Sequence, residues 1–228
     1  MQVGDPILEG WAIYRRFWEH LVLIALFTYV VVSVISLVLA LAGGFLGELG
    51  GIVVSIAGVF LLQGALVEAV ADVRDGRADL TLFATLGRVW PLIGKIVAAS
   101  LLAGLVIAIG FLLIIFPGLY LVTIFSVVVP VIVLERTGVF EAFSRSRALV
   151  RGYGWTVFGV ILVTFVLNLI ASLVLTSLLH GLSNVAAQYI SSVVVNTLLA
   201  PFVAATWTSM YFRLKELHAP ATTPAFET

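Results

Sequence analysis

Long apolar runs separated by short polar stretches extend from residue 21 to residue 212 of the chain. An α-helix needs about 20 consecutive apolar residues to cross the hydrocarbon core of a membrane. Six runs match or approach this length, so the pattern predicts six transmembrane helices joined by short connections. These helices are expected at residues 21–41, 52–73, 91–116, 119–134, 155–179 and 189–212.

Glycine and proline residues indicate where neighbouring spans end or bend. The glycine-rich segment 43–51 predicts a turn after the first span, although its glycines also have the four-residue spacing of helix-contact motifs. Pro117 and Gly118 predict a tight break between the third and fourth spans. Pro130 and Pro201 predict kinks in the fourth and sixth spans.

A short amphipathic segment precedes the first, third and fifth spans. In the third of these segments, Glu141 stands four residues before Arg145, which is the favourable order for an ion pair on a helix. Helices with one apolar and one basic face lie in the membrane interface. We therefore expect three interfacial helices on the cytoplasmic side, at about residues 5–18, 79–90 and 139–150.

The same order of parts occurs three times: an interfacial helix, a span, a short outer turn and a returning span. Each unit begins and ends on one side, so the sequence predicts three parallel helix-pair repeats. The repeat units are placed at about residues 5–73, 79–134 and 138–214, within a single transmembrane domain of residues 1–217. Residues 218–228 are expected to form a disordered cytoplasmic tail.

Composition supports an all-α polytopic membrane protein. Hydrophobic residues make up 62% of the chain and charged residues 11%, whereas a soluble domain has about half apolar and about a quarter charged residues. Six spans use up the 228 residues, so no soluble catalytic domain is expected. The absence of cysteine excludes disulfides and thiolate metal sites.

The distribution of charge predicts the orientation in the membrane. All twelve Lys and Arg residues fall on the side of the predicted spans that holds both termini. The opposite side carries only Glu48 and the titratable His180. Because short cytoplasmic loops are enriched in Lys and Arg, both termini are expected in the cytoplasm.

Polar side chains inside the spans are the candidates for function. Lys95 is expected to extend to the interface, with Glu68 paired to it or to a loop arginine; the alternative is a buried Glu68–Lys95 pair on a substrate path. Gln63 and Asn168 fall near the middle of the second and fifth spans. There a single amide is expected to join helices, and the alternative is a polar pocket lined by both.

Three arginines of the third amphipathic segment, Arg145, Arg147 and Arg151, are candidate contacts for anionic lipid headgroups. Each cation near an anionic membrane surface contributes on the order of 1 kcal/mol. The alternative is that they only anchor the helix and set the topology. The histidines lack metal-ligand spacing and no nucleophile or phosphate-loop motif is present, so no catalytic residue, metal or cofactor is predicted.

Three stretches stand out beyond their hydropathy, at residues 116–121 (FPGLYL), 129–135 (VPVIVLE) and 139–155 (VFEAFSRSRALVRGYGW). They resemble the core of bacterial six-span proteins related to the membrane domain of some glycerophosphoryl diester phosphodiesterases. Relatives often have Trp at the position of Arg147. In those enzymes catalysis belongs to a separate soluble barrel domain. The resemblance therefore implies a stand-alone module of the bacterial inner (plasma) membrane, with no active site carried over.

The sequence thus predicts a non-enzymatic membrane module that organises lipids or partner proteins at the cytoplasmic face. Expected partners are membrane lipids, anionic ones included, and a membrane protein, with no nucleic acid. A transporter for small molecules or lipids is the alternative, and a polar cavity reaching Gln63 and Asn168 would favour it. A lipid-modifying enzyme is a third possibility, favoured by carboxylates or histidines clustered at the inner interface.

Overall fold

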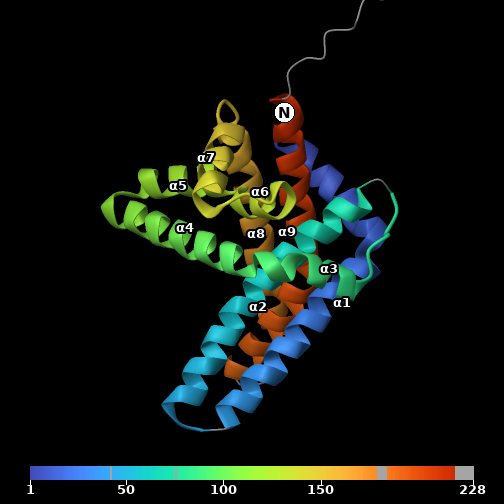
Figure 1. The fold of residues 1–228 in the computed structure, drawn as a ribbon, viewed down its shortest axis with the longest axis vertical. Helices are drawn as coiled ribbons and strands as arrows, with labels where there is room; N and C mark the ends of the chain where they lie inside the picture. The colour runs from blue at the N-terminus through green and yellow to red at the C-terminus, as the bar shows by residue number, and fades with distance from the viewer. Residues whose placement is uncertain (42, 75, 179–183, 219–228) are drawn as a thin grey trace, which may run out of the picture.

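The computed structural model describes residues 1–41, 43–74, 76–178 and 184–218, and only the backbone of residues 40 and 184–192. Within these ranges all regular structure is helical and no strand occurs. The elements in chain order are α1 (Gly4–Leu41), α2 (Gly44–Val73), α3 (Leu82–Val89), η1 (Trp90–Leu92), α4 (Ile93–Leu113), α5 (Ile115–Phe125), α6 (Val128–Glu135), α7 (Val139–Val150), α8 (Gly154–Leu178) and α9 (Asn184–Leu217) (Figure 1).

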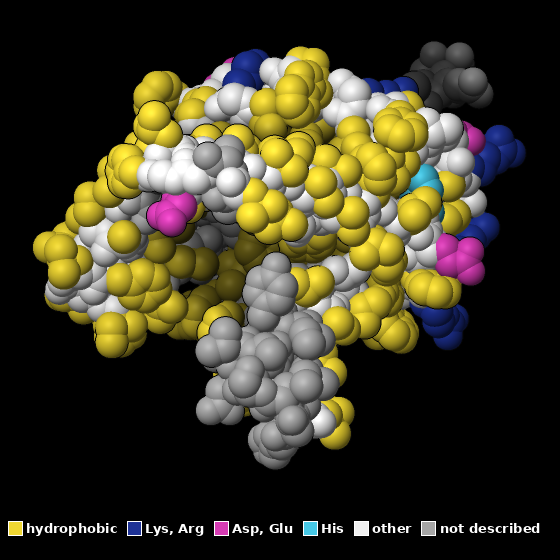
Figure 2. All heavy atoms as spheres, turned by 90° about the horizontal axis from the view of Figure 1, so that it is seen from below, with side chains coloured by type: hydrophobic (Ala, Val, Ile, Leu, Met, Phe, Trp, Pro, Cys, Tyr) yellow, Lys and Arg dark blue, Asp and Glu magenta, His cyan; other side chains and the backbone are white. Residues whose placement is uncertain are grey.

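Six helical stretches are long and apolar enough to cross a membrane, which confirms the predicted number. They are Gly4–Leu39, Gly44–Val73, Leu82–Leu113, Ile115–Glu135, Gly154–Leu178 and Val193–Leu217. Hydrophobic side chains cover most of the face seen in Figure 2, and Lys and Arg side chains show only at its edges. An exposed apolar surface of this extent is typical of a membrane-interacting protein. The fold is therefore compatible with a multi-pass membrane protein.

Helix α1 packs along both α2 and α9. Gly10 allows a close approach to α9, because a Cβ atom added there would lie 2.7 Å from the Cα atom of Thr206. The first turns of α1 thus lie beside the last turns of α9, and Arg213 comes within 3.9 Å of Asp5. Both ends of the described chain lie at the same end of the molecule (Figure 1), as an even number of spans requires.

The short helix α6 lies in the middle of the packing. It contacts α2, α4, α7 and α9, and Val131, Ile132 and Val133 are fully buried. A hydrophobic cluster around these residues includes Val157 of α8 and Tyr211 of α9. This cluster joins the second half of the chain to the α1–α2–α9 bundle.

The predicted glycine-rich turn at residues 43–51 is much shorter in the structure. The chain turns at Gly43, which has a φ of 83°, and α2 has begun by Gly44. A Cβ atom at Gly47 would collide with a carbonyl of α1, and one at Gly51 would lie 3.3 Å from the carbonyl oxygen of Ser36. These two glycines therefore form the helix contact that their four-residue spacing permits.

The two breaks predicted from proline lie earlier in the chain than expected. Helix α4 ends at Ile114, whose extended backbone has φ −161° and ψ 150°, whereas Pro117 and Gly118 lie in the first turns of α5. The fourth span is interrupted at residues 126–127, between α5 and α6. This is one turn before Pro130, because the proline ring clashes with the carbonyl four residues earlier and offers it no N–H donor.

Two of the three predicted interfacial helices continue directly into the following span. The first is part of α1, where only Phe17 departs from helical geometry with φ −120° and ψ 23°. The second, α3, runs through η1 into α4, and only α7 is a separate helix. The α4–α5 hairpin points away from the α1–α2 hairpin (Figure 1). The interfacial placement and the threefold repeat stay predictions.

Helix α9 continues through Pro201, so this proline does not end the sixth span. A turn is also predicted after the fifth span, at residues 180–184; its residues 180–183 lie outside the described residues, and residue 184 begins α9. The predicted tail beyond residue 218 also lies outside them.

Candidate functional site

Ion pairs join the helix ends near the start and the end of the described chain. Glu9 of α1 accepts a hydrogen bond from Arg213 Nε at 2.7 Å and lies 3.6 Å from Arg74 Nε. Arg74 also pairs with Glu216 at 2.7 Å. These contacts link the start of α1 to the ends of α2 and α9. We call this end of the molecule the charged end. It also holds the ion pairs of Glu68 and Glu135, which are described next.

Glu68 is the most buried carboxylate of this end, with 9% of its side chain exposed. It pairs with Arg88 Nη1 and Arg136 Nη2, each at 3.3 Å. Lys95 lies elsewhere, exposed, and its ammonium group donates to the carbonyl of Thr137 at 3.4 Å. The predicted Glu68–Lys95 pair is therefore wrong. The alternative, a loop arginine, is confirmed by Arg136, which follows α6, and Arg88 of α3 is a further partner.

Glu135, at the end of α6, binds partners from two other helices. Its carboxylate accepts hydrogen bonds from Arg145 Nε at 3.0 Å and from the hydroxyl of Tyr211 at 2.8 Å, and Lys215 Nζ lies 3.4 Å away. The predicted pairing of Arg145 with Glu141 is wrong, and Arg145 as a headgroup contact stays a prediction. Its guanidinium is held by Glu135, which α6 presents to it.

An apolar cavity of about 1050 Å³ lies between α5, α7 and α8. Its walls include Phe116, Leu119, Ile124, Ala148, Trp155 and Phe158, and Arg147 and Arg151 stand at its edge. Helix α5 contributes residues from its first to its last turn. The α5–α8 contact joins chain segments that no local sequence pattern relates.

Helix α7 lines this cavity with one stripe of side chains. Ser144 lies three and four residues before Arg147 and Ala148, and Arg151, directly after α7, lies four and three residues beyond them. This spacing places the four residues on one face of a helix. Arg145 is two residues from Arg147, and each helical residue turns the chain by about 100°. Arg145 therefore points to the opposite side, toward α6.

The guanidinium groups of Arg147 and Arg151 are exposed, and neither forms an ion pair or hydrogen bond with any residue that the structure describes. Arginine is the side chain best suited to bind a phosphate group, because its planar N–H donors match two oxygens at once. These two residues are therefore available to an anionic ligand.

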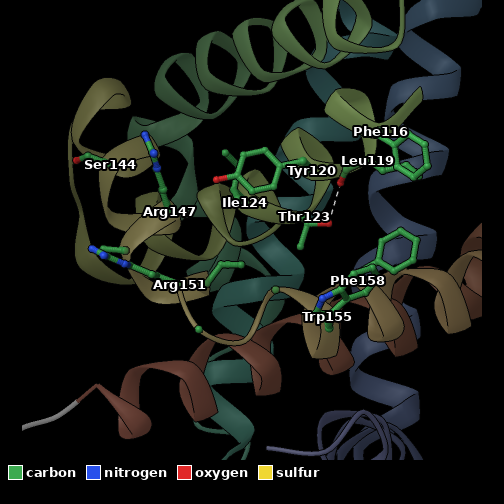
Figure 3. Close-up of a pocket in the computed structure, with 14 residues that line it drawn as sticks. Phe116, Leu119, Tyr120, Thr123, Ile124, Ser144, Arg147, Arg151, Trp155 and Phe158 are labelled. Carbon is green, nitrogen blue, oxygen red and sulfur yellow. Dashed lines mark hydrogen bonds between the residues drawn. The ribbon is translucent and has the colours of Figure 1, made fainter. Parts of the chain in front are cut away.

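The cavity has a polar edge and an apolar interior. Figure 3 shows Ser144, Arg147 and Arg151 along one edge, with Phe116 and Phe158 at the opposite end. The hydroxyl of Tyr120 points toward the arginine edge. In the wall, the Thr123 hydroxyl donates to the carbonyl of Leu119 at 2.8 Å, so its polarity is satisfied within α5. The site thus suits a ligand that is anionic at one end and apolar at the other.

The midspan amides are not brought together. Gln63 is exposed and Asn168 is half-buried, and neither side chain forms a hydrogen bond with another described residue. Among the described residues, no hydrogen bond supports a helix-joining role for either amide. Neither residue lines the large cavity or the smaller one of about 270 Å³ beside Glu68.

The smaller cavity is polar and lies among groups that are already paired. Glu68, Asp72, Arg88 and Arg136 line it, and Asp72 accepts a hydrogen bond from the backbone N–H of Leu80 at 2.9 Å. In the described part of the chain, no group of three His, Asp or Glu side chains is arranged to hold a metal ion. The larger cavity with its free arginines is thus the candidate site.

Neither a family model, a curated protein nor a solved structure matches this chain. The relationship to glycerophosphoryl diester phosphodiesterase membrane domains stays a prediction.

Sequence reasoning found Arg147 and Arg151 but missed the cavity beside them. The helical spacing of Ser144, Arg147, Ala148 and Arg151 was the available signal, and it separates Arg145 from the other two arginines. Tyr120 and Trp155 belong to the conspicuous stretches 116–121 and 139–155. No pattern indicates that they border one cavity, because they lie on different apolar spans.

Proposed function

We propose that this protein is a non-enzymatic membrane module that holds anionic lipids at its charged end, at the cytoplasmic face of a bacterial inner membrane. The six long apolar helices support a membrane location. The gathering of Lys and Arg beside both termini supports the cytoplasmic orientation, since short cytoplasmic loops carry the excess of these residues. The threefold repeat and the kinship with phosphodiesterase membrane domains belong to the same proposal.

The observation that carries the proposal is the contrast among the arginines. Arg74, Arg88, Arg136, Arg145 and Arg213 are in ion pairs within the protein. Arg147 and Arg151 are exposed and, like Arg15 of α1, have no such partner among the described residues, but of these three only Arg147 and Arg151 line the large cavity. A cation near an anionic membrane surface contributes on the order of 1 kcal/mol, about a fivefold preference for an anionic lipid. Two such residues on one helix face favour lipid headgroups over water.

The test is enrichment of anionic lipid around the protein in bilayer nanodiscs that mix phosphatidylglycerol with phosphatidylcholine. Native mass spectrometry after partial delipidation counts the lipids that stay bound. We expect the wild-type protein to retain phosphatidylglycerol in preference, and Arg147→Gln with Arg151→Gln to lose most of this preference. Arg15→Gln with Lys95→Gln is the matched control, because it removes two exposed cations outside α7.

Equal loss in both double variants would mean that overall charge, rather than α7, attracts the lipids. Unchanged enrichment in the Arg147→Gln, Arg151→Gln protein would contradict the proposal. Lipids and proteins that copurify from native membranes identify the natural partners in the same preparation.

Transport was the alternative function, and it depended on a polar cavity that reaches Gln63 and Asn168. Neither residue lines either of the two described cavities. No observation on the described residues favours transport over lipid binding.

A further inference from the structure

We infer that the cavity between α5, α7 and α8 is a site for one anionic phospholipid. Its phosphate would lie against Arg147 and Arg151, and one acyl chain would lie along α5 and α8. The inference rests on the proposed function and adds a defined site and ligand class to it.

The cavity wall provides a path for an acyl chain. It includes α5 residues from Phe116 to Ile124, a segment whose eight residue-to-residue steps span roughly 12 Å at the rise of an α-helix. Phe158 and Trp155 of α8 form the facing wall. The volume of about 1050 Å³ equals or exceeds the largest pockets that hold drug-sized ligands, about 1,000 Å³. An apolar chain fills this space better than a compact polar molecule.

The cavity opens onto the apolar surface of the protein. Phe116, Tyr120 and Trp155 line it and are 80%, 56% and 87% exposed. Phe116 lies near the tip of the α4–α5 hairpin, which points away from the bundle (Figure 1). A ligand therefore enters from the side that membrane lipids cover, which selects a lipid over a free phosphate ion.

The polar edge selects the charge of the headgroup. Arg147 of α7 and Arg151, the residue directly after α7, are four residues apart and both line the cavity. The carboxylates nearest to them in sequence are engaged elsewhere. Glu141 accepts the backbone N–H of Gly138 at 3.4 Å, and Glu135 is bound by Arg145. Two unpaired guanidinium groups bind a phosphate that carries net charge more strongly than a zwitterionic headgroup, whose own cation they repel.

The experiment measures binding of dioleoyl phosphatidylglycerol to the delipidated full-length protein in mild detergent, by native mass spectrometry. We expect one tightly bound molecule per chain, with much weaker binding of dioleoyl phosphatidylcholine. Arg147→Gln with Arg151→Gln should weaken binding about 30-fold, because the attraction of each arginine to an anionic lipid corresponds to roughly a fivefold change in affinity. Ala148→Trp should abolish it by filling the cavity from an exposed position.

Ala84→Trp is the matched control, because Ala84 is an exposed residue of α3 that does not line the cavity. It should bind phosphatidylglycerol as the wild type does. If Ala148→Trp also binds one molecule normally, the cavity is not the site, although the enrichment that defines the proposed function would survive. Displacement of the lipid by inorganic phosphate alone would likewise overturn the inference, since the arginines would then act without the cavity.

A second measurement uses the unaltered protein. Trp155 lines the cavity, so phosphatidylglycerol with brominated acyl chains should quench tryptophan fluorescence more than brominated phosphatidylcholine does. The difference should disappear in Trp155→Phe. Equal quenching by the two lipids in the wild-type protein would contradict a selective site.

Discussion

Arg145 and Arg147 show how position on a helix decides what a charged side chain can do. They are two residues apart on α7 and therefore project about 200° from each other. Arg145 meets Glu135 at 3.0 Å, whereas Arg147 borders the cavity. Their shared chemistry predicts one role for both arginines. The helix geometry instead places Arg145 in an ion pair and Arg147 beside the cavity.

Substitution of these two residues should separate stability from lipid binding. Arg145→Gln removes one of the partners of Glu135, which is 16% exposed, so we expect a loss of about 1 kcal/mol in stability with little change in lipid retention. Arg147→Gln should lower lipid retention and leave the thermal midpoint unchanged. Both are read in detergent by thermal unfolding and native mass spectrometry. Equal destabilisation by the two variants would be inconsistent with this division.

The α1–α2 hairpin illustrates what glycines determine at the scale of an element. Gly47 and Gly51 let the backbone of α2 approach α1. The contact is completed by polar groups, because the hydroxyl of Ser36 donates to the carbonyl of Gly51 at 3.2 Å and lies 3.0 Å from the hydroxyl of Ser55. Small residues and hydroxyl groups replace hydrophobic burial as the source of helix association in a membrane.

Gly47→Ala should destabilise the hairpin, because its new methyl group would meet a carbonyl of α1. Forced contacts of this kind cost about 1–3 kcal/mol. Gly104→Ala in α4 is the control. It has nothing within 4 Å of the added atom, so it should be neutral or stabilise by up to about 1 kcal/mol. Chemical unfolding in detergent measures both, and a stable Gly47→Ala protein would show that the helices can move apart freely.

The break between α5 and α6 is also stabilised by a contact with another helix. The chain leaves helical geometry between α5 and α6, where carbonyl groups at the end of α5 lose helical partners. Ser146 of α7 is fully buried and donates its hydroxyl to the carbonyl of Ile124 at 2.7 Å. The break required by Pro130 is thus stabilised by a residue from the next helix.

At the scale of the whole molecule, the ion pairs lie at one end of a largely apolar structure. The ion pairs of Glu9, Glu68 and Glu135 connect α1, α2, α3, α6, α7 and α9 there. Glu48 lies near the start of α2, at the opposite end. This asymmetry orients the molecule if the charged end stays in the cytoplasm.

The orientation can be tested directly, because the chain contains no cysteine. Glu48→Cys should react with a membrane-impermeant maleimide in intact cells from which the outer membrane has been removed. Arg15→Cys, at the charged end, should react only after lysis. The reverse pattern would place the charged end outside and contradict the proposed lipid contacts with the cytoplasmic leaflet.

The sequence by itself determined the number of long apolar helices and the confinement of Lys and Arg to one end. Both follow from hydropathy and charge along the chain, which depend on local composition alone. It also gave the helical spacing that puts Ser144, Arg147, Ala148 and Arg151 on one face. These features required no knowledge of which helices are neighbours.

Only the tertiary structure decided which charges are paired and where a cavity lies. Arg213 and Glu9 are 204 residues apart, and Tyr211 and Glu135 are 76 residues apart. Such contacts depend on the packing of helices whose apolar surfaces look alike in sequence. For the same reason the sequence offered Glu141 or Lys95 as partners, while packing placed Glu135 beside Arg145 and two arginines beside Glu68.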